Sequence, residues 1–172
     1  MRSLPSAEPW LHPALSVGVS PIEGRGLFAV EPVAVGVSVV VFGGRLVTDA
    51  ELAAVFAAST EYVDTLSIDV DLNLVLPGRA PAGFGNHCCD PNLWWGGDYS
   101  LMTRRPLQIG DEATLDYGTI TDATDFTMAC SCATSLCRRE VTGQDWRLPD
   151  LQERYDSHWV PALQRRISGG LD

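Results

Sequence analysis

Apolar and polar residues alternate along short stretches of this chain, which predicts a mostly β protein. From Val17 onward, runs of apolar and β-branched residues are bounded by turns that contain Gly or Pro. The run 37–42 is apolar on both faces and is therefore expected to form a buried strand. Strands are also predicted at 62–66 and 67–76. The second of these would place five apolar side chains on one face: Ile68, Val70, Leu72, Leu74 and Leu76.

The β pattern continues further along the chain and is flanked by less regular segments. Residues 93–103 predict a strand pair around a Gly-Gly-Asp turn, and 113–117 predicts the last strand of the core. The polar residues 118–129 are expected to form a mobile connector. Residues 1–16 carry three prolines and no periodicity, so we expect an extended arm, which Trp10 could pin to the body together with Leu11.

Two stretches have helical character. Thr48 and Glu51 have the spacing of a capping box, which predicts a short helix at 49–58. The last part of the chain has apolar residues at helical spacing that is interrupted near Pro161, which predicts one or two amphipathic helices docked on the β core. These apolar residues are Leu148, Leu151, Tyr155, Trp159 and Leu163.

Composition narrows the classes of partner. The chain has 172 residues, enough for one domain with a modest appendage, and a formal net charge of −10. Nucleic acid is therefore a poor direct partner and a basic peptide a good one, although the acidity could also serve solubility alone. All of the basic residues are Arg, so the chain has no lysine.

The sequence also bears on compartment and on the state of the cysteines. Prolines and Glu8 interrupt the N-terminal segment where a signal peptide needs an apolar core, and the uncharged run 32–44 is too short to span a bilayer. We therefore expect a cytoplasmic protein without a membrane partner. In that compartment the five cysteines argue for metal binding or reactive thiols rather than disulfides.

Four motifs resemble those of one protein family. NHCCDPN at 86–92 and GDEATLDY at 110–117 are similar to two signature segments of SET-domain protein-lysine methyltransferases. EGRGLFA at 23–29 resembles the N-terminal Gly-x-Gly element of that family, and CSCATSLC at 130–137 resembles its cysteine-rich post-SET segment. The four motifs occur in the family's order and together span roughly 17–143.

The resemblance implies a fold and a domain plan. The fold would be mostly β (α+β), a SET fold of several small β-sheets with a short helical insert. An N-terminal arm at 1–16 would precede a SET domain at 17–120, whose helical insert would lie at about 48–60. A zinc-binding post-SET segment would follow at 121–143, and a C-terminal helical tail at 144–172.

The cysteines suggest a structural metal site. Cys130, Cys132 and Cys137 supply three thiolates, whereas structural Zn²⁺ takes four tetrahedral ligands. The resemblance implies that Cys89 completes the set, with Cys88 as a spare thiol that could compete for the role. The alternative is that these cysteines are free buried thiols.

The resemblance also implies a methyl donor, S-adenosylmethionine, and a catalytic residue, Tyr117. The cofactor-binding residues would be Gly24, Arg25, Gly26, Leu27, Phe28, Asn86, His87 and Tyr117. Taken singly, a Gly-Arg-Gly sequence is more often an ordinary turn, a His a hydrogen-bonded structural residue, and a Tyr at a strand end part of the core.

Two residues depart from the family pattern in the substrate channel. Phe42 and Leu115 stand where the family usually has a Tyr and an aromatic residue, so the channel would be looser. A looser channel predicts that already methylated lysine is accepted, giving di- or trimethylation. The same departures could instead lower turnover.

The sequence therefore predicts a protein-lysine N-methyltransferase that acts on a basic, lysine-containing protein, such as a histone, a histone-like protein or a ribosomal protein. One alternative is a non-catalytic SET-like peptide-binding module. Another is a zinc-stabilised interaction domain, which would leave 23–29 and 110–117 without a role. The oligomeric state is left open.

Overall fold

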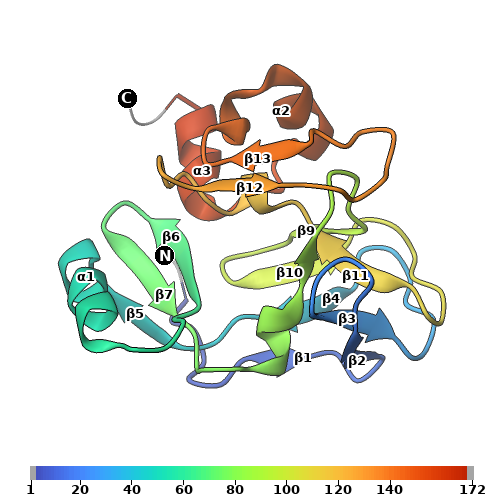
Figure 1. The fold of residues 1–172 in the computed structure, drawn as a ribbon, viewed down its shortest axis with the longest axis horizontal. Helices are drawn as coiled ribbons and strands as arrows, with labels where there is room; N and C mark the ends of the chain where they lie inside the picture. Colours follow the sequence, from blue (N-terminus) through green and yellow to red (C-terminus); the bar gives the residue numbers. More distant parts are fainter. Residues whose placement is uncertain (1–2, 170–172) are drawn as a thin grey trace.

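The computed structural model describes residues 3–169, which form small β-sheets with short helices around them (Figure 1). The β1–β4 region and the β9–β11 region occupy the lower right of the view, and β5–β7 with α1 lie at the left. β12, β13, α2 and α3 lie at the top. No helix within the described range is long and apolar enough to cross a membrane.

Two four-stranded sheets build the centre of the molecule. The first has the order β1 (Trp10–Leu11), β4 (Ser38–Val41), β10 (Ser100–Thr103) and β9 (Leu93–Trp95), all antiparallel. The second has the order β2 (Leu15–Val19), β3 (Arg25–Ala29), β11 (Glu112–Leu115) and β8 (Asn86–His87), in which β8 runs parallel to β11. The predicted pair at 93–103 is confirmed, and residues 10–11 of the predicted arm form a strand, β1.

The two central sheets share one hydrophobic core. Leu27 of β3, Leu93 of β9 and Ala113 of β11 are wholly buried in it. Val39 and Val40 of β4 are consecutive and are also wholly buried, which confirms the prediction that the run 37–42 is covered on both faces. The core therefore holds in place the strand ends from which the candidate site residues project.

A third sheet and a helix form a lobe beside the core. β5 (Arg45–Val47), β7 (Leu72–Val75) and β6 (Thr65–Asp69) pair antiparallel in that order, next to α1 (Asp49–Ala58). The helix begins at the predicted capping box: the Glu51 backbone N–H donates to Thr48 Oγ1 at 3.2 Å, and the Thr48 N–H donates to Glu51 Oε2 at 2.8 Å. No residue of α1 is fully buried.

The prediction of one strand at 67–76 is wrong. Residues 65–75 form a hairpin that turns at Asp71, which has a left-handed φ of 48°. Val70 lies in this turn and is 58% exposed, whereas Ile68 and Leu74 are wholly buried. A hairpin with a short turn keeps the alternation of apolar residues in phase, so periodicity does not separate it from one long strand.

The tail packs against the core as two short helices, α2 (Pro149–Tyr155) and α3 (Pro161–Ile167). Pro161 is the first residue of α3, which explains the predicted interruption. Leu151, Tyr155, Trp159 and Leu163 are buried as predicted, but Leu148 is 39% exposed because it lies at the N-cap of α2 rather than within the helix.

Short elements connect these units. The two-stranded sheet β12 (Thr127–Ala129) and β13 (Glu140–Thr142) includes part of the segment predicted as a connector. The 3₁₀ turns are η1 (Pro81–Phe84), η2 (Tyr117–Thr119) and η3 (Asp145–Arg147). Tyr117 therefore lies in a 3₁₀ turn after β11 and not in the strand predicted at 113–117.

Candidate functional site

A cavity of about 410 Å³ lies between the α1 lobe and the end of β11. Phe42, Leu115 and Tyr117, which the sequence placed in a substrate channel or a catalytic role, all line it. Most of the other lining residues are apolar or aromatic, and they include Phe56, Tyr62, Leu66, Leu76, Leu101 and Phe126. The cavity therefore has the largely apolar wall and few polar groups that are typical of a ligand site.

Tyr117 makes two hydrogen bonds to the segment 85–87. Its hydroxyl donates to the Gly85 carbonyl at 2.9 Å, and its backbone N–H donates to His87 Nδ1 at 3.1 Å. Burial raises the pKa of Tyr117 to about 12, and the nearby Tyr62 and Asp64 add to this shift. The phenol is therefore neutral at physiological pH, so its oxygen can orient a ligand by hydrogen bonding but does not act as a phenolate base.

Asn86 joins β8 to the turn before β3. Its Nδ2 donates to the Glu23 carbonyl at 3.1 Å, the Arg25 carbonyl at 3.0 Å and Glu112 Oε1 at 2.8 Å. Gly24 gives this turn a left-handed φ of 45°. These contacts bring the motif at 86–92 against the motif at 23–29, although more than fifty residues separate the two motifs in the chain.

The predicted cofactor-binding residues take three different environments. Gly24 and Arg25 are exposed, and the Arg25 guanidinium lies 4.5 Å from the centre of the Phe84 ring. Leu27 is wholly buried in the core, so only its backbone could meet a ligand. Of the whole predicted set, Tyr117 alone lines the 410 Å³ cavity. The set is Gly24, Arg25, Gly26, Leu27, Phe28, Asn86, His87 and Tyr117.

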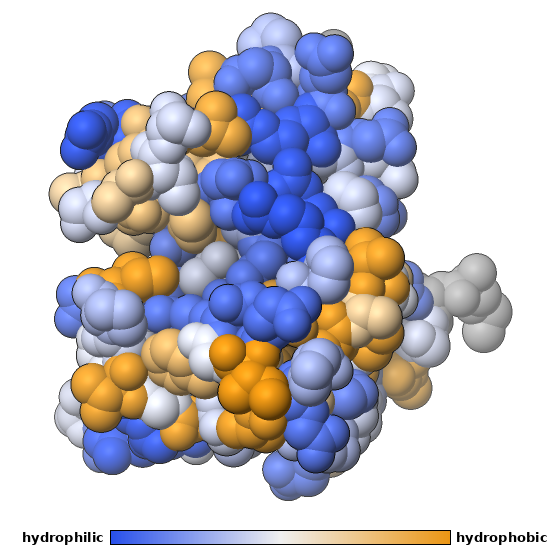
Figure 2. Space-filling model, turned by 90° about the vertical axis from the view of Figure 1, so that its right-hand side faces the viewer, coloured by the Kyte–Doolittle hydropathy of each residue, from blue (hydrophilic) through white to orange (hydrophobic). Residues whose placement is uncertain are grey.

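A hollow crosses the middle of one face of the molecule (Figure 2). It lies between the upper part, which carries β12, β13 and the tail helices, and the lower part, which carries β1–β3. Tyr117 links the 410 Å³ cavity to the motif at 86–92, because its side chain lines the cavity and its backbone N–H is bonded to His87, next to Asn86. The cavity and the 86–92 motif are therefore joined through one residue, Tyr117.

Gly26 is required where Asn86, Glu112 and β3 meet. A Cβ at this position would lie 2.1 Å from Glu112 Oε1 and 3.2 Å from Asn86 Nδ2. We expect Gly26→Ala to lower the free energy of unfolding by about 1–3 kcal/mol, because Glu112 must move out of its contact with Asn86. Urea unfolding measures this loss.

The matched control for that variant is Gly78→Ala. Gly78 is exposed, has no positive φ, and a Cβ there would meet no atom within 4 Å. We expect its free energy of unfolding to stay the same or rise slightly. Equal stability of the two variants would contradict the close packing at Gly26.

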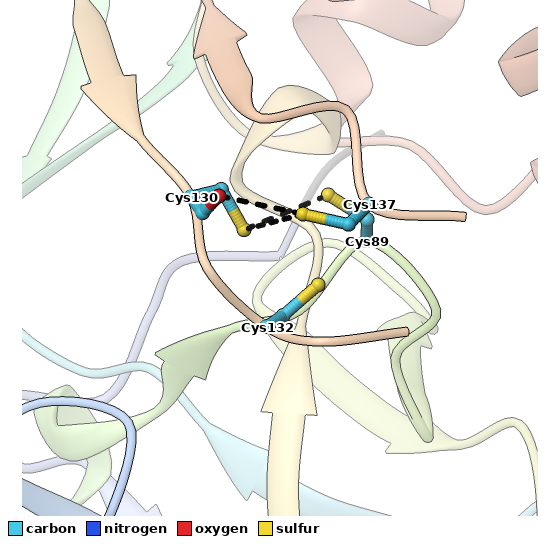
Figure 3. Close-up of side chains that lie close together, drawn as sticks. All are labelled: Cys89, Cys130, Cys132 and Cys137. Carbon is cyan, nitrogen blue, oxygen red and sulfur yellow. Dashed lines mark hydrogen bonds between the residues drawn. The ribbon is translucent and has the colours of Figure 1, made fainter. Parts of the chain in front are cut away.

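Four cysteines converge from two distant parts of the chain (Figure 3). Cys89 follows β8, whereas Cys130, Cys132 and Cys137 come from the segment between β12 and β13, and the four sulfurs all lie within 4.8 Å of one another. Cys88 lies beside Cys132 but outside this group, and burial raises its pKa to about 11.

The spacing of the sulfurs fits a zinc ion. The Sγ atoms of Cys89 and Cys130 are 3.8 Å apart, and those of Cys137 and Cys130 are 3.9 Å apart. A tetrahedron with Zn–S bonds of about 2.3 Å has S–S edges of about 3.8 Å. These two distances match such an edge and all four sulfurs lie within 4.8 Å of one another, so the predicted thiols, with Cys89 as the fourth, have the number and chemistry of a zinc donor set.

A buried ion-pair network, not expected from the sequence, connects the cysteine segment to Tyr117. Arg138 donates to both carboxylate oxygens of Asp116 at 2.6 Å, and its Nε lies 2.9 Å from Asp145 Oδ2. The Tyr155 hydroxyl of the tail donates to Asp116 Oδ2 at 2.8 Å. Arg138 follows Cys137 directly and Asp116 precedes Tyr117, so the network joins the thiol cluster, the tail and the candidate catalytic turn.

Comparisons with known proteins find relatives by sequence and by fold. No protein-family model matches the chain. Histone-lysine N-methyltransferase ash1 of Drosophila melanogaster is 26% identical over 161 residues, which is 86% of this chain, and trithorax, also a histone-lysine N-methyltransferase of that fly, is 32% identical over 142 residues, or 72% of this chain. The matches span only 7% and 4% of those relatives.

A solved structure shares the fold. The methyltransferase domain of human histone-lysine N-methyltransferase SETMAR superposes with a TM-score of 0.59 and 19% identity. The superposition covers 76% of this chain and 57% of the SETMAR chain. The mostly β architecture with small sheets predicted from the motifs is therefore confirmed.

Proposed function

We propose that the chain is a member of the SET-domain family and a protein-lysine N-methyltransferase that uses S-adenosylmethionine. The observation that carries the proposal is the position of Tyr117, whose ring lines the cavity while its backbone is bonded to His87 of β8. A lysine in the cavity and a methyl donor beside β3 and β8 would meet at this residue.

The donor site would be formed by the backbone of 24–28, by Asn86 and by His87. The Asn86 Nδ2 donates to the carbonyls of Glu23 and Arg25 and to the Glu112 carboxylate. Within residues 3–169 the Asn86 Oδ1 accepts no hydrogen bond. That oxygen is suited to a donor group of the cofactor, such as its amine or ribose hydroxyls. When bound, S-adenosylmethionine supplies an electrophilic sulfonium methyl group.

The residues that line the cavity would prepare the lysine amine for attack. Lysine is protonated at neutral pH because its reference pKa is about 10.4, so its ammonium group must release a proton to solvent before the amine attacks. The apolar wall that includes Phe42 and Leu115 excludes water, which lowers the pKa of a buried amine and favours its neutral form. The neutral hydroxyl of Tyr117 then aligns the amine with the methyl group, and alignment together with dehydration supplies most of the rate.

A basic protein is the proposed substrate. The chain carries a net charge of −10, which favours encounter with a cationic segment. The relatives ash1 and trithorax are named histone-lysine methyltransferases, so a histone-type tail is the first substrate to test. The alternative is a module that holds a peptide without methylating it. The departures from the family pattern at Phe42 and Leu115 support this alternative.

Transfer of a radioactive methyl group from S-adenosylmethionine to a histone mixture tests the proposal. We expect Tyr117→Phe to lower kcat on the order of a hundredfold while calorimetry shows unchanged binding of S-adenosylmethionine, because only the alignment of the amine is lost. The chain has no lysine, so label found on a lysine side chain comes from the substrate.

Tyr99→Phe is the control for this experiment. Tyr99 is buried and its hydroxyl donates to the Ser3 carbonyl at 3.1 Å, away from the cavity lining. It should keep the wild-type kcat. Binding of S-adenosylmethionine and of peptide without any transfer by the wild type would instead establish the peptide-binding module.

A further inference from the structure

The cavity contains one acidic side chain, Asp64, which lies between α1 and β6. Its carboxylate faces Gly83, because a Cβ on that glycine would lie 3.4 Å from Asp64 Oδ2. Gly83 is two residues before Gly85, whose carbonyl accepts the Tyr117 hydroxyl. Asp64 therefore belongs to the same wall as the candidate catalytic residue, and its charge also helps to raise the pKa of Tyr117.

Among residues 3–169, Asp64 has no ion-pair partner, whereas several other partly or fully buried acids do. Asp90 pairs with Arg104 and Arg105, Asp116 with Arg138, and Asp122 with Arg166. By contrast, the side chain of Asp64 makes no hydrogen bond or ion pair with any residue from 3 to 169, and no basic residue lines the cavity. Burial raises the pKa of Asp64, because partial removal from water destabilises its negatively charged form.

The surroundings of Asp64 suit a cationic side chain. The rings of Phe56, Tyr62 and Phe126 line the same cavity, and aromatic faces attract cations. Phe56 is 50% exposed and Tyr62 is 88% exposed, so this side of the cavity is open to an approaching peptide. A carboxylate next to open aromatic rings is the composition expected of a subsite for an organic cation.

The target lysine is not the cation that this subsite would bind during transfer, since its amine must be neutral to attack. A carboxylate held against it would stabilise the ammonium form and oppose the reaction. A second cation that stays charged has no such conflict. Arginine fits best, because its guanidinium remains protonated and can bond a carboxylate with two N–H groups.

We propose that Asp64 is a specificity residue that selects substrates with an arginine within two residues of the target lysine, bound between Asp64 and the neighbouring rings. The inference rests on the proposed function, since it assigns a substrate class to the same site. It divides the cavity into two subsites, an apolar one at Tyr117, Phe42 and Leu115 for the target lysine and an acidic one at Asp64 for its neighbour.

Three peptides that differ only beside their single lysine test the proposal. The two residues on each side of that lysine are all arginine, all citrulline, which is the neutral isostere of arginine, or all alanine. Calorimetry measures the peptide Kd, and methyl transfer measures KM and kcat. For the wild type we expect the arginine peptide to bind about tenfold more tightly than the citrulline peptide, with similar kcat and with a preference that shrinks as salt is raised.

Asp64→Asn is the decisive variant and Glu61→Gln its control. Glu61 is exposed, lies in the same segment and does not line the cavity, so its substitution removes an equal charge from outside the site. The preference for arginine over citrulline should disappear in Asp64→Asn and persist in Glu61→Gln. Thermal unfolding verifies that Asp64→Asn folds, and the citrulline comparison on the wild type needs no variant.

Two results would overturn the proposal: equal binding of the arginine and citrulline peptides by the wild type, or a preference that survives in Asp64→Asn. Failure of the proposed function looks different. In that case no peptide is methylated, while the tenfold preference measured by calorimetry still depends on Asp64.

Discussion

Asp116→Asn is expected to lower the free energy of unfolding by about 3–5 kcal/mol, because it leaves Arg138 buried with its main counter-charge removed. Asp116 is 1% exposed and accepts hydrogen bonds from Arg138, Tyr155 and the Gly118 N–H. The new amide can accept only through its single oxygen, so at least one of these donors loses its partner.

Equilibrium unfolding in urea or guanidinium chloride, followed by circular dichroism, measures that loss. Asp122→Asn serves as the control, because Asp122 pairs with Arg166 at 3.0 Å with both side chains partly exposed. Its expected cost is below about 1 kcal/mol. Similar losses in the two variants would mean that the Asp116 network contributes no more than a surface ion pair.

Cys89→Ser is expected to abolish stoichiometric zinc binding and to destabilise the protein more than any other single change considered. Structural zinc sites bind with about 10–16 kcal/mol in small zinc-finger peptides at neutral pH, and a site with one thiolate removed loses a large share of this. Here the β core has its own hydrophobic interior, so we expect the cysteine segment to open first. Metal analysis and limited proteolysis of residues 121–143 report the two effects.

Cys88→Ser is the matched control for the zinc site. The two cysteines are adjacent and buried, but only Cys89 has its sulfur in the four-thiol group. Cys88→Ser should keep one zinc ion per chain and its resistance to proteolysis. Loss of zinc in Cys88→Ser with retention in Cys89→Ser would reverse the ligand assignment.

Zinc loss should also reach the candidate catalytic turn. The Arg138 N–H lies 3.4 Å from Cys89 Sγ, and the guanidinium of the same residue holds Asp116, which precedes Tyr117. A displaced cysteine segment would withdraw Arg138 from Asp116. The stability of the thiol cluster and the position of the phenol are therefore coupled through one arginine.

Local features of the sequence predict the structure correctly where a few neighbouring residues determine the backbone conformation. Thr48 and Glu51 made the predicted capping box, and Pro161 began the second tail helix. The hairpin at 65–75 was missed because an Asp at a left-handed turn position gives a weak signal inside an unbroken alternation. The error changed the chain direction and the burial of the turn: Ile68 and Leu74 are buried as predicted, but Val70 is exposed.

Some residues of the candidate site could be predicted from the sequence and others could not. The family resemblance indicated Cys89 as a partner for the three later cysteines, and the structure brings the four sulfurs together. It also indicated Phe42, Leu115 and Tyr117, which share a cavity. It gave no signal for Asp64 or for Arg138, because one acid in a loop and one arginine after a cysteine are common in any sequence.

The sequence by itself determined the β class, the helix boundaries set by caps and prolines, and the residues with metal-binding or catalytic chemistry, because each depends on a few neighbouring residues. Only the tertiary structure decided which charges are paired and which are left alone. Within residues 3–169, Arg138 pairs with Asp116 whereas Asp64 has no cationic partner, because packing brings together segments that are distant in the chain. The electrostatic free energy of a charge depends on what that packing places within a few ångströms of it.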